Sequence, residues 1–200
     1  MAQAFAWDVR HWTDVREFRA HLGRAVPSPL FWMRGAQRNR VSRLVVHHTW
    51  RPTLSQWRGA ASMSALGRYY KNDVAWYDSK GAKRKGWSAG PHLFIADDGI
   101  WQGTPLTAEG VHAGACNQVA IGVEVVGDYD SGDWPDLVRM YVVGALAALS
   151  DHLDIPLREI VGHRDCGSPK SCPGKAIDLA VVRVLVGAEQ AAWASRGPCL

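Results

Sequence analysis

Residues 163–174 read His163-Arg164-Asp165-Cys166-Gly167-Ser168-Pro169-Lys170-Ser171-Cys172-Pro173-Gly174, a segment that contains an imidazole, an ammonium group and two thiols. It follows the short apolar run Ile160-Val161-Gly162, which is typical of a strand end. Its glycines and prolines favour turns, and catalytic groups are often carried on loops that rigid elements hold in place. We therefore expect a functional site at the end of this strand.

A second apolar run, Leu44-Val45-Val46-His47-His48-Thr49, also ends in imidazoles. Its apolar residues do not alternate with polar ones, which is typical of a strand inside a sheet with both faces buried. Neighbouring side chains on a strand point to opposite faces, so at most one of His47 and His48 reaches a given site. A single histidine of this kind is more often a structural residue. Together with His163 and Cys172, however, one of them completes a zinc centre with an open fourth position.

Two charged residues fit such a centre. Lys170 lies two residues before Cys172, where its ammonium group could stabilise a tetrahedral oxyanion, although an isolated lysine is usually just exposed. Glu124 lies in the otherwise apolar run from Ala120 to Gly127. A buried carboxylate is costly unless it is paired or functional, and beside a metal site it is a natural general base.

The composition indicates one core. The chain has 200 residues, of which 47% are hydrophobic and 21% charged, and no shift in composition marks a second domain. The formal net charge of +4 favours approach to polyanions such as nucleic acid, anionic lipid or bacterial wall polymers. The densest cationic cluster is Lys80, Lys83, Arg84 and Lys85. This cluster is either a solvated loop or a contact to an acidic substrate.

The four cysteines, Cys116, Cys166, Cys172 and Cys199, do not form a disulfide scaffold in a chain of this length, and we assign no partner to Cys116, Cys166 or Cys199. The N-terminus lacks the basic start and the apolar stretch of a signal peptide. No run reaches the roughly 18 apolar residues that span a bilayer. We expect a soluble protein without a membrane span, made in the cytoplasm with reduced thiols.

Periodicity and turn residues predict alternating helices and strands. Thr13 or Asp14 caps a first helix, which packs as an N-terminal flap, and residues 72–89 are expected to form a long polar loop. Asp133 and Pro135 start a later helix with Leu137 and Met140 on its apolar stripe. Further helices are expected over residues 54–70 and 177–193, strands over 43–48, 120–127 and 159–162, and a hairpin over 92–102.

Six motifs in a fixed order carry a family resemblance. They are Val45-Val46-His47-His48-Thr49, the run from His92 to Gly99 (His-Leu-Phe-Ile-Ala-Asp-Asp-Gly), Gly110-Val111-His112-Ala113-Gly114, the run from Asn117 to Gly127, Gly162-His163-Arg164-Asp165 and Cys172-Pro173-Gly174. The combination resembles the type 2 N-acetylmuramoyl-L-alanine amidases over about residues 43–190. That family includes phage lytic amidases, recycling amidases for anhydro-muropeptides and animal peptidoglycan recognition proteins.

The resemblance implies an α/β fold, in which a mixed central β-sheet is flanked by helices on both faces and a zinc site lies in a surface groove. It also implies one amidase domain over residues 1–200, with an N-terminal helical extension (1–40) and a catalytic core (41–195). The ligands of Zn²⁺ would be His47, His163 and Cys172, with His48 in a packing role. Lys170 matches the lysine found two positions before the last ligand in catalytic members.

The resemblance also implies substrate contacts at the positions of His112 and Asn117. We expect further contacts from His92 and from Trp87, whose indole could stack on a sugar face, although core packing is the commoner role of a tryptophan. For His112 and Asn117, loop stabilisation is an equally good interpretation. One position departs from many phage and recognition-protein members, which have a tyrosine where Pro91 precedes His92. Recycling enzymes instead have a glutamate in the strand that carries Glu124 here, so we assign the role of catalytic base to Glu124.

The expected function is zinc-dependent hydrolysis of the amide bond between N-acetylmuramic acid and L-alanine in peptidoglycan. The protein resembles a bacteriolytic phage or prophage endolysin, made in the host cytoplasm and acting on the wall in the periplasm after a holin-type protein permeabilises the membrane. We expect a monomer whose partner is peptidoglycan or a muropeptide, and no nucleic acid. The alternatives are a cytosolic recycling amidase and a non-catalytic peptidoglycan-binding module. Some phage relatives also bind an RNA polymerase, a role that residues 1–35 could serve.

Overall fold

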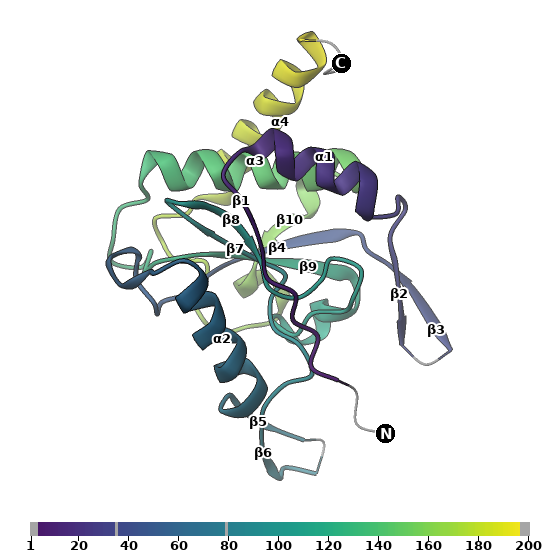
Figure 1. Cartoon of the computed structure of the whole chain (residues 1–200), viewed down its shortest axis with the longest axis vertical. Helices are drawn as coiled ribbons and strands as arrows, with labels where there is room; N and C mark the ends of the chain where they lie inside the picture. Colours follow the sequence, from purple (N-terminus) through teal and green to yellow (C-terminus); the bar gives the residue numbers. More distant parts are fainter. Residues whose placement is uncertain (1–3, 35, 79, 197–200) are drawn as a thin grey trace.

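The computed structural model describes residues 4–34, 36–78 and 80–196, and a six-stranded mixed sheet forms its centre (Figure 1). The strands lie in the order β1 (Arg10–Trp12), β8 (Gly99–Gln102), β7 (Leu93–Ala96), β9 (Ala120–Val125), β4 (Arg43–His48) and β10 (Ile160–Gly162). The last four are parallel to one another, whereas β8 and β1 add antiparallel pairs. The expected mixed sheet is confirmed.

Helices cover both faces of this sheet (Figure 1). On one side lie α1 (Val15–Ala25), α3 (Asp136–Leu153) and α4 (Leu179–Ser195), and on the other lies α2 (Ala60–Asn72). Side chains along β7 alternate between the two faces of the sheet, and both faces are apolar. Leu93 and Ile95 belong to the large core under α3, whereas Phe94 packs with Met63 and Leu66 of α2. Because both faces of these strands are covered, their sequences are continuous apolar runs.

The parallel strands bring the chemical groups to one edge. β4 and β9 pair so that His47 lies opposite Glu124, and β10 pairs with β4 so that Gly162 lies opposite Val46. His163 follows β10 directly, as the first residue of the 3-10 helix η4 (His163–Cys166). The carboxyl ends of parallel strands are the usual place for sites in α/β sheets.

The helix expected over residues 54–70 is interrupted. A short 3-10 helix, η1 (Leu54–Gln56), ends at Trp57, and α2 begins only at Ala60, because Gly59 has a φ of +53°. The Trp57 indole N–H donates to Asp98 Oδ1 at 3.0 Å, and that of Trp101 donates to the same oxygen at 2.9 Å. The helical spacing of the apolar residues continued through this break, so the spacing alone did not indicate it.

The long loop expected over residues 72–89 is wrong in part. Two short strands, β5 (Ala75–Tyr77) and β6 (Lys83–Lys85), pair as an antiparallel hairpin there. All six of their residues are exposed. Without a buried face these strands have no apolar alternation, which is the signal that predicts a strand.

The first 40 residues form more than the expected helical extension. Asp14 caps α1 as expected, accepting from the Arg16 N–H at 2.7 Å, and Phe18 and Leu22 are buried. In addition, β1 extends the central sheet beside β8, and β2 (Phe31–Arg34) pairs with β3 (Gln37–Arg40). The N-terminal segment is therefore an integral part of the sheet edge.

Two details on the α3 side also differ from expectation. Leu137 and Met140 are exposed rather than inward, because Val138 and Val142, each one or two positions further on, face the core. Glu159 belongs to the 3-10 helix η3 (Leu157–Glu159) rather than to a strand. Its carboxylate pairs with Arg43 at 2.8 Å and ties η3 to β4. The last helix faces inward as expected, with Leu179, Val182 and Val186 buried.

A disulfide corrects the expectation of unpartnered, reduced thiols. Cys116, in the 3-10 helix η2 (Gly114–Val119), bonds to Cys166 in η4, across 50 residues of sequence. Cys172 is a free, buried thiol. Cys199 lies outside the described residues. None of the described helices is long and apolar enough to cross a membrane.

Candidate metal centre

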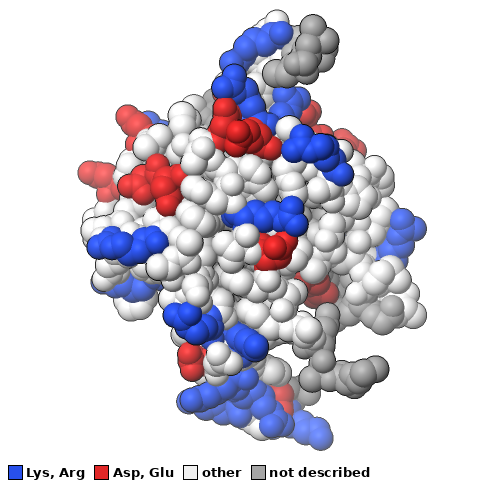
Figure 2. All heavy atoms as spheres, in the orientation of Figure 1, with Lys and Arg blue, Asp and Glu red and all other residues white. Residues whose placement is uncertain are grey.

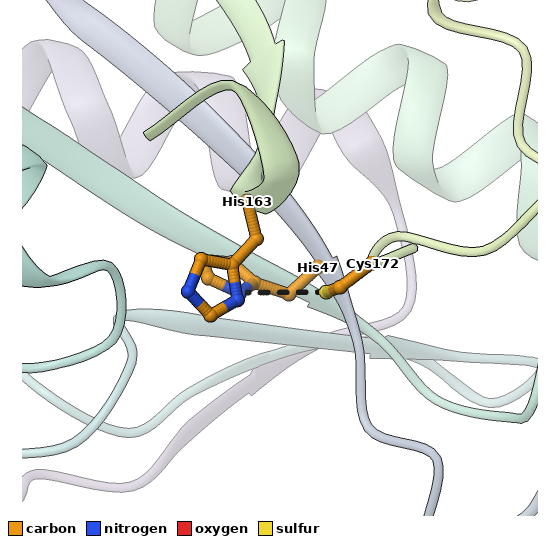
Figure 3. A group of neighbouring side chains, drawn as sticks. All are labelled: His47, His163 and Cys172. Atoms are coloured by element: carbon orange, nitrogen blue, oxygen red, sulfur yellow. Dashed lines mark hydrogen bonds between the residues drawn. The ribbon is translucent and has the colours of Figure 1, made fainter. Parts of the chain in front are cut away.

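Three of the predicted site residues come together at the strand ends (Figure 3). His47, His163 and Cys172 each offer one ligand atom, and these atoms all lie within 4.8 Å of one another. Cys172 Sγ is 3.8 Å from His47 Nδ1, and the His47 and His163 ring centres are 4.6 Å apart. His47 and Cys172 are buried, whereas His163 is half-buried, so the group opens on the His163 side.

The backbone explains how these side chains meet. His47 points to the α2 side of the sheet, and His48 to the opposite side, where its Nδ1 accepts from the Tyr129 N–H at 3.0 Å. That placement agrees with the packing role expected for His48. The loop between the other two ligands closes on itself, because the Arg164 N–H donates to the Cys172 carbonyl at 3.0 Å. Cys172 is thereby turned back toward His163.

A chain of hydrogen bonds orients the His47 ring. His112 Nε2 lies 3.1 Å from the Ala120 carbonyl, which can only accept, so Nε2 carries the proton. Burial lowers the pKa of His112 to about 3, so its ring is neutral and Nδ1 accepts a hydrogen bond. His47 Nε2, at 3.0 Å, must donate to it. The lone pair of His47 Nδ1 is then directed at Cys172, as ligation by this nitrogen requires.

Glu124 completes the group from the neighbouring strand. Its side chain is buried, and Oε1 lies 3.9 Å from His47 Nδ1. Oε2 is buried without a hydrogen-bond partner among the described residues. Burial raises the pKa of Glu124 to about 8. An orphaned carboxylate oxygen inside a protein is costly, so its position beside the ligand atoms indicates a function.

Lys170 contributes positive charge at the open side. Its side chain is exposed, and its ammonium group lowers the pKa of His163 in addition to the larger effect of burial. The pKa of the Cys172 thiol is raised to about 12, mainly by burial and then by the charge of Glu124. A thiol in such surroundings needs a cation beside it to become a thiolate ligand.

The donor set fits zinc. Two histidine nitrogens and one cysteine sulfur are the donors that zinc prefers, and three protein ligands leave a fourth position free. Bonds of about 2.3 Å to sulfur and 2.0 Å to nitrogen place a tetrahedral sulfur and nitrogen roughly 3.5 Å apart, close to the 3.8 Å between Cys172 Sγ and His47 Nδ1. Glu124 Oε1 lies beside the same group, 3.9 Å from His47 Nδ1.

The sequence of residues 37–175 matches the family model described as N-acetylmuramoyl-L-alanine amidase. The chain belongs to this amidase family. The match spans all three candidate ligands, Glu124 and Lys170. No curated protein sequence gives a significant match.

Solved structures of the amidase family share this fold. A mutant endolysin from Bacillus subtilis is 21% identical, with a TM-score of 0.56, and the match covers 81% of this chain and 94% of the endolysin. A selenomethionine derivative of AmpD is 25% identical at the same TM-score of 0.56, with 80% and 92% covered. Drosophila PGRP-LB in complex with tracheal cytotoxin is 18% identical at 0.56, with 90% and 88% covered.

The four residues expected to contact the substrate differ from one another in their surroundings in this structure. Asn117 Oδ1 accepts from the N–H groups of His112 and Ala113, so it stabilises the loop that carries His112. His112 itself is buried against His47. Trp87 is half-buried and stacks on Tyr70.

His92 does not reach the surface, which corrects the expectation of a substrate contact. It is fully buried and stacked on Trp32. Its Nδ1 accepts from the Gly122 N–H at 3.0 Å, and its Nε2 donates to the Ala108 carbonyl at 3.0 Å. The motif placed His92 at the start of a strand, but the sequence contained no sign that both nitrogens are used internally.

Two contributions to the site had no signal in the sequence. Tyr70, at the C-terminal turn of α2, lies close enough to Glu124 for the carboxylate charge to raise its phenol pKa, after the larger effect of burial. The Cys116–Cys166 disulfide ties η2, which follows His112, to η4, which begins with His163. Both depend on tertiary contacts between segments far apart in the chain.

Proposed function

We propose that this chain is a zinc-dependent N-acetylmuramoyl-L-alanine amidase acting on peptidoglycan. The proposal rests on the buried Glu124 carboxylate. Its Oε1 lies 3.9 Å from Nδ1 of His47, one of the three candidate ligands, and its Oε2 has no hydrogen-bond partner among the described residues. A ligand set alone would fit a structural metal site. A buried acid beside an open ligand set supports hydrolysis instead.

The residues have separable roles. His47, His163 and Cys172 would hold the zinc ion, which when bound supplies a Lewis acid that activates water at neutral pH. Glu124, whose ionised form a bound zinc ion would favour over the neutral form that burial favours, accepts the proton of the attacking water and passes it to the leaving amine. Lys170, on the open side, stabilises the negative charge that develops on the scissile carbonyl oxygen. His112 positions the His47 ring through the hydrogen bond at 3.0 Å.

The biological setting of this proposal is lysis of a bacterial host. The chain would be made in the host cytoplasm and would reach the wall after a holin-type protein has permeabilised the membrane. The disulfide between Cys116 and Cys166 is consistent with action in an oxidising compartment such as the periplasm. Similarity to a mutant endolysin from Bacillus subtilis supports this setting.

Mass spectrometry of the products from purified sacculi tests the proposal. Zinc-loaded protein should release free stem peptides with an L-alanine N-terminus, and a Cys172→Ala variant should release none. If sacculi stay intact while a soluble anhydro-muropeptide is cleaved, the recycling function replaces the lytic one. If neither substrate is cleaved but muropeptide binds, the chain is a binding module and the proposed catalysis is wrong.

A further inference from the structure

Positive charge is concentrated on one segment of the chain. Residues 68–87, which include the end of α2 and the β5–β6 hairpin, contain six lysines and arginines and two aspartates. Their net charge of +4 equals the formal net charge of the whole chain, so the remaining residues are neutral in sum. Figure 2 shows lysine and arginine gathered at the end of the molecule where Figure 1 shows β5 and β6.

The lysines of this segment are free to bind a ligand. Among the described residues of the hairpin, Arg84 forms an ion pair with Asp78 at 2.9 Å. Among the described residues, no carboxylate pairs with Lys71, Lys80, Lys83 or Lys85. Four unpaired ammonium groups in so short a segment repel one another, so an anionic partner would relieve that repulsion.

Exposed aromatic rings lie among these lysines. Tyr77 is 69% exposed and pairs across the hairpin with Lys83, so both side chains lie on one face, together with Lys85. Trp76 is 41% exposed on the other face, and its indole N–H donates to the Gly86 carbonyl at 2.8 Å, which holds the ring in place. Fixed, exposed rings beside cations are suited to stacking on sugar faces while the cations pair with carboxylates.

The segment is connected to the metal centre. Figure 1 shows β5 and β6 beyond the end of α2, on the side of the sheet to which His47 and Glu124 point. Tyr70 links the two places, because its ring lies 6.3 Å from that of Phe94, which is opposite Glu124 in the sheet, and stacks on Trp87 at 5.4 Å. The Trp87 N–H also donates to the Tyr70 carbonyl at 2.7 Å, next to the hairpin base.

We propose that the β5–β6 hairpin binds the anionic peptidoglycan polymer beyond the unit that is cleaved. Lys80, Lys83 and Lys85 pair with free carboxylates of neighbouring stem peptides, and Tyr77 stacks on a sugar of the glycan strand. This inference rests on the proposed function, and it assigns the polymer, rather than a soluble muropeptide, as the substrate.

Two triple variants of equal net charge test this surface. Lys80→Gln/Lys83→Gln/Lys85→Gln changes the hairpin, and Arg24→Gln/Arg38→Gln/Arg158→Gln removes three exposed arginines outside it, none of them paired with a carboxylate in the described residues. Each lowers the formal net charge from +4 by three. Matching thermal unfolding would show that both variants fold.

Binding is measured by sedimentation with sacculi, in a Glu124→Gln background that does not digest them. The hairpin variant should bind about tenfold more weakly at low salt, as expected for three exposed ion pairs, and the difference should shrink as salt rises. The control variant should bind like the parent protein. In an active background, turnover of a soluble muropeptide should be unchanged in both.

Equal binding of the two triple variants to sacculi would overturn the inference. If both bound more weakly than the parent protein, net charge would explain the attraction, and if both bound like the parent protein, another surface would explain it. Retention on sacculi accompanied by a hairpin-dependent loss of binding to anionic lipid vesicles or to DNA would also overturn it, and would assign the hairpin to that partner. Failure of the proposed function has a different signature. In that case the parent protein cleaves neither sacculi nor the soluble muropeptide, while the sedimentation result is still obtained.

Discussion

At the scale of single residues, His47 is the point on which the site converges. Its Nε2 donates to His112 at 3.0 Å, and its Nδ1 faces Cys172 at 3.8 Å and Glu124 at 3.9 Å. The hydrogen bond to His112 therefore fixes the orientation of the His47 ring, and the lone pair on Nδ1 is directed toward Cys172 and Glu124. Ligand histidines in metal sites are usually held in this way by a second hydrogen bond.

Substitution of the proposed base should separate catalysis from metal binding. Glu124→Gln keeps the size of the side chain but cannot accept the proton, so turnover should fall by several orders of magnitude. Loss of general-base catalysis by itself lowers a rate by roughly 10²–10⁴-fold. Zinc content, measured by elemental analysis, should stay at the parent level because Glu124 is outside the ligand set. Near-normal turnover in this variant would exclude Glu124 as the base.

At the scale of elements, close packing between β9 and the His112 loop maintains the orientation of His47. A Cβ at Gly122 would lie 2.6–2.7 Å from ring atoms of His112. Gly122 also donates its N–H to His92, so this glycine contacts both buried histidines. A side chain here would push His112 away from His47.

Gly122→Ala should therefore weaken zinc binding without touching a ligand. We expect roughly 10–100-fold lower zinc affinity, measured by competition with a chelator, because the outer hydrogen bond to His47 is lost. The matched control is Gly23→Ala, since no atom lies within 4 Å of a Cβ at this helical glycine. The control should bind zinc normally and be up to about 1 kcal/mol more stable. If Gly122→Ala bound zinc as tightly as Gly23→Ala, the positioning role of His112 would be wrong.

The sequence predicted those elements whose residues carry a local signal. The apolar runs of β4 and β9, the Asp-Gly turn of the β7–β8 hairpin and the Asp14 cap of α1 could all be recognised from neighbouring residues. The break at Gly59 and the exposed β5–β6 hairpin could not, because tertiary hydrogen bonds and charge, rather than periodicity, determine them. Likewise the motifs predicted which site residues lie together, but not that His92 uses both ring nitrogens inside the protein.

At the scale of the whole molecule, the Cys116–Cys166 disulfide closes a loop of 50 residues that contains β9 and α3. In the chain-entropy model, closing a loop of this length stabilises the folded state by about 4 kcal/mol. The cysteine spacing did not predict the bond, because the pairing depends on the meeting of η2 and η4 in the fold.

A Cys116→Ser/Cys166→Ser variant should lose about that free energy of unfolding, measured in guanidinium chloride under oxidising conditions. In the presence of a reductant the parent protein should become as unstable as the variant. Equal stability of variant and parent without reductant would show that the bond does not form or does not stabilise the fold.

Buried histidines should make the whole fold sensitive to acid. Burial lowers the pKa of His92 to about 4, so the folded state binds fewer protons than the unfolded state, whose histidine titrates near 6.5. The stability that His92 provides is thus complete above pH 6.5 and is lost as the pH falls through about 4, with a total on the order of 3 kcal/mol. A His92→Gln variant, followed by denaturant unfolding from pH 7 to 4, should show a shallower loss. An unchanged slope would assign acid sensitivity to other groups.

X-ray absorption at the zinc edge of the zinc-loaded chain tests whether two histidines and one cysteine form the proposed zinc centre. We predict one bound zinc per chain, with one sulfur and two imidazole nitrogens among its nearest neighbours, from Cys172, His47 and His163. Loss of the sulfur signal in Cys172→Ser would identify that ligand. A parent spectrum without sulfur, or a chain that does not retain zinc, would exclude this ligand set.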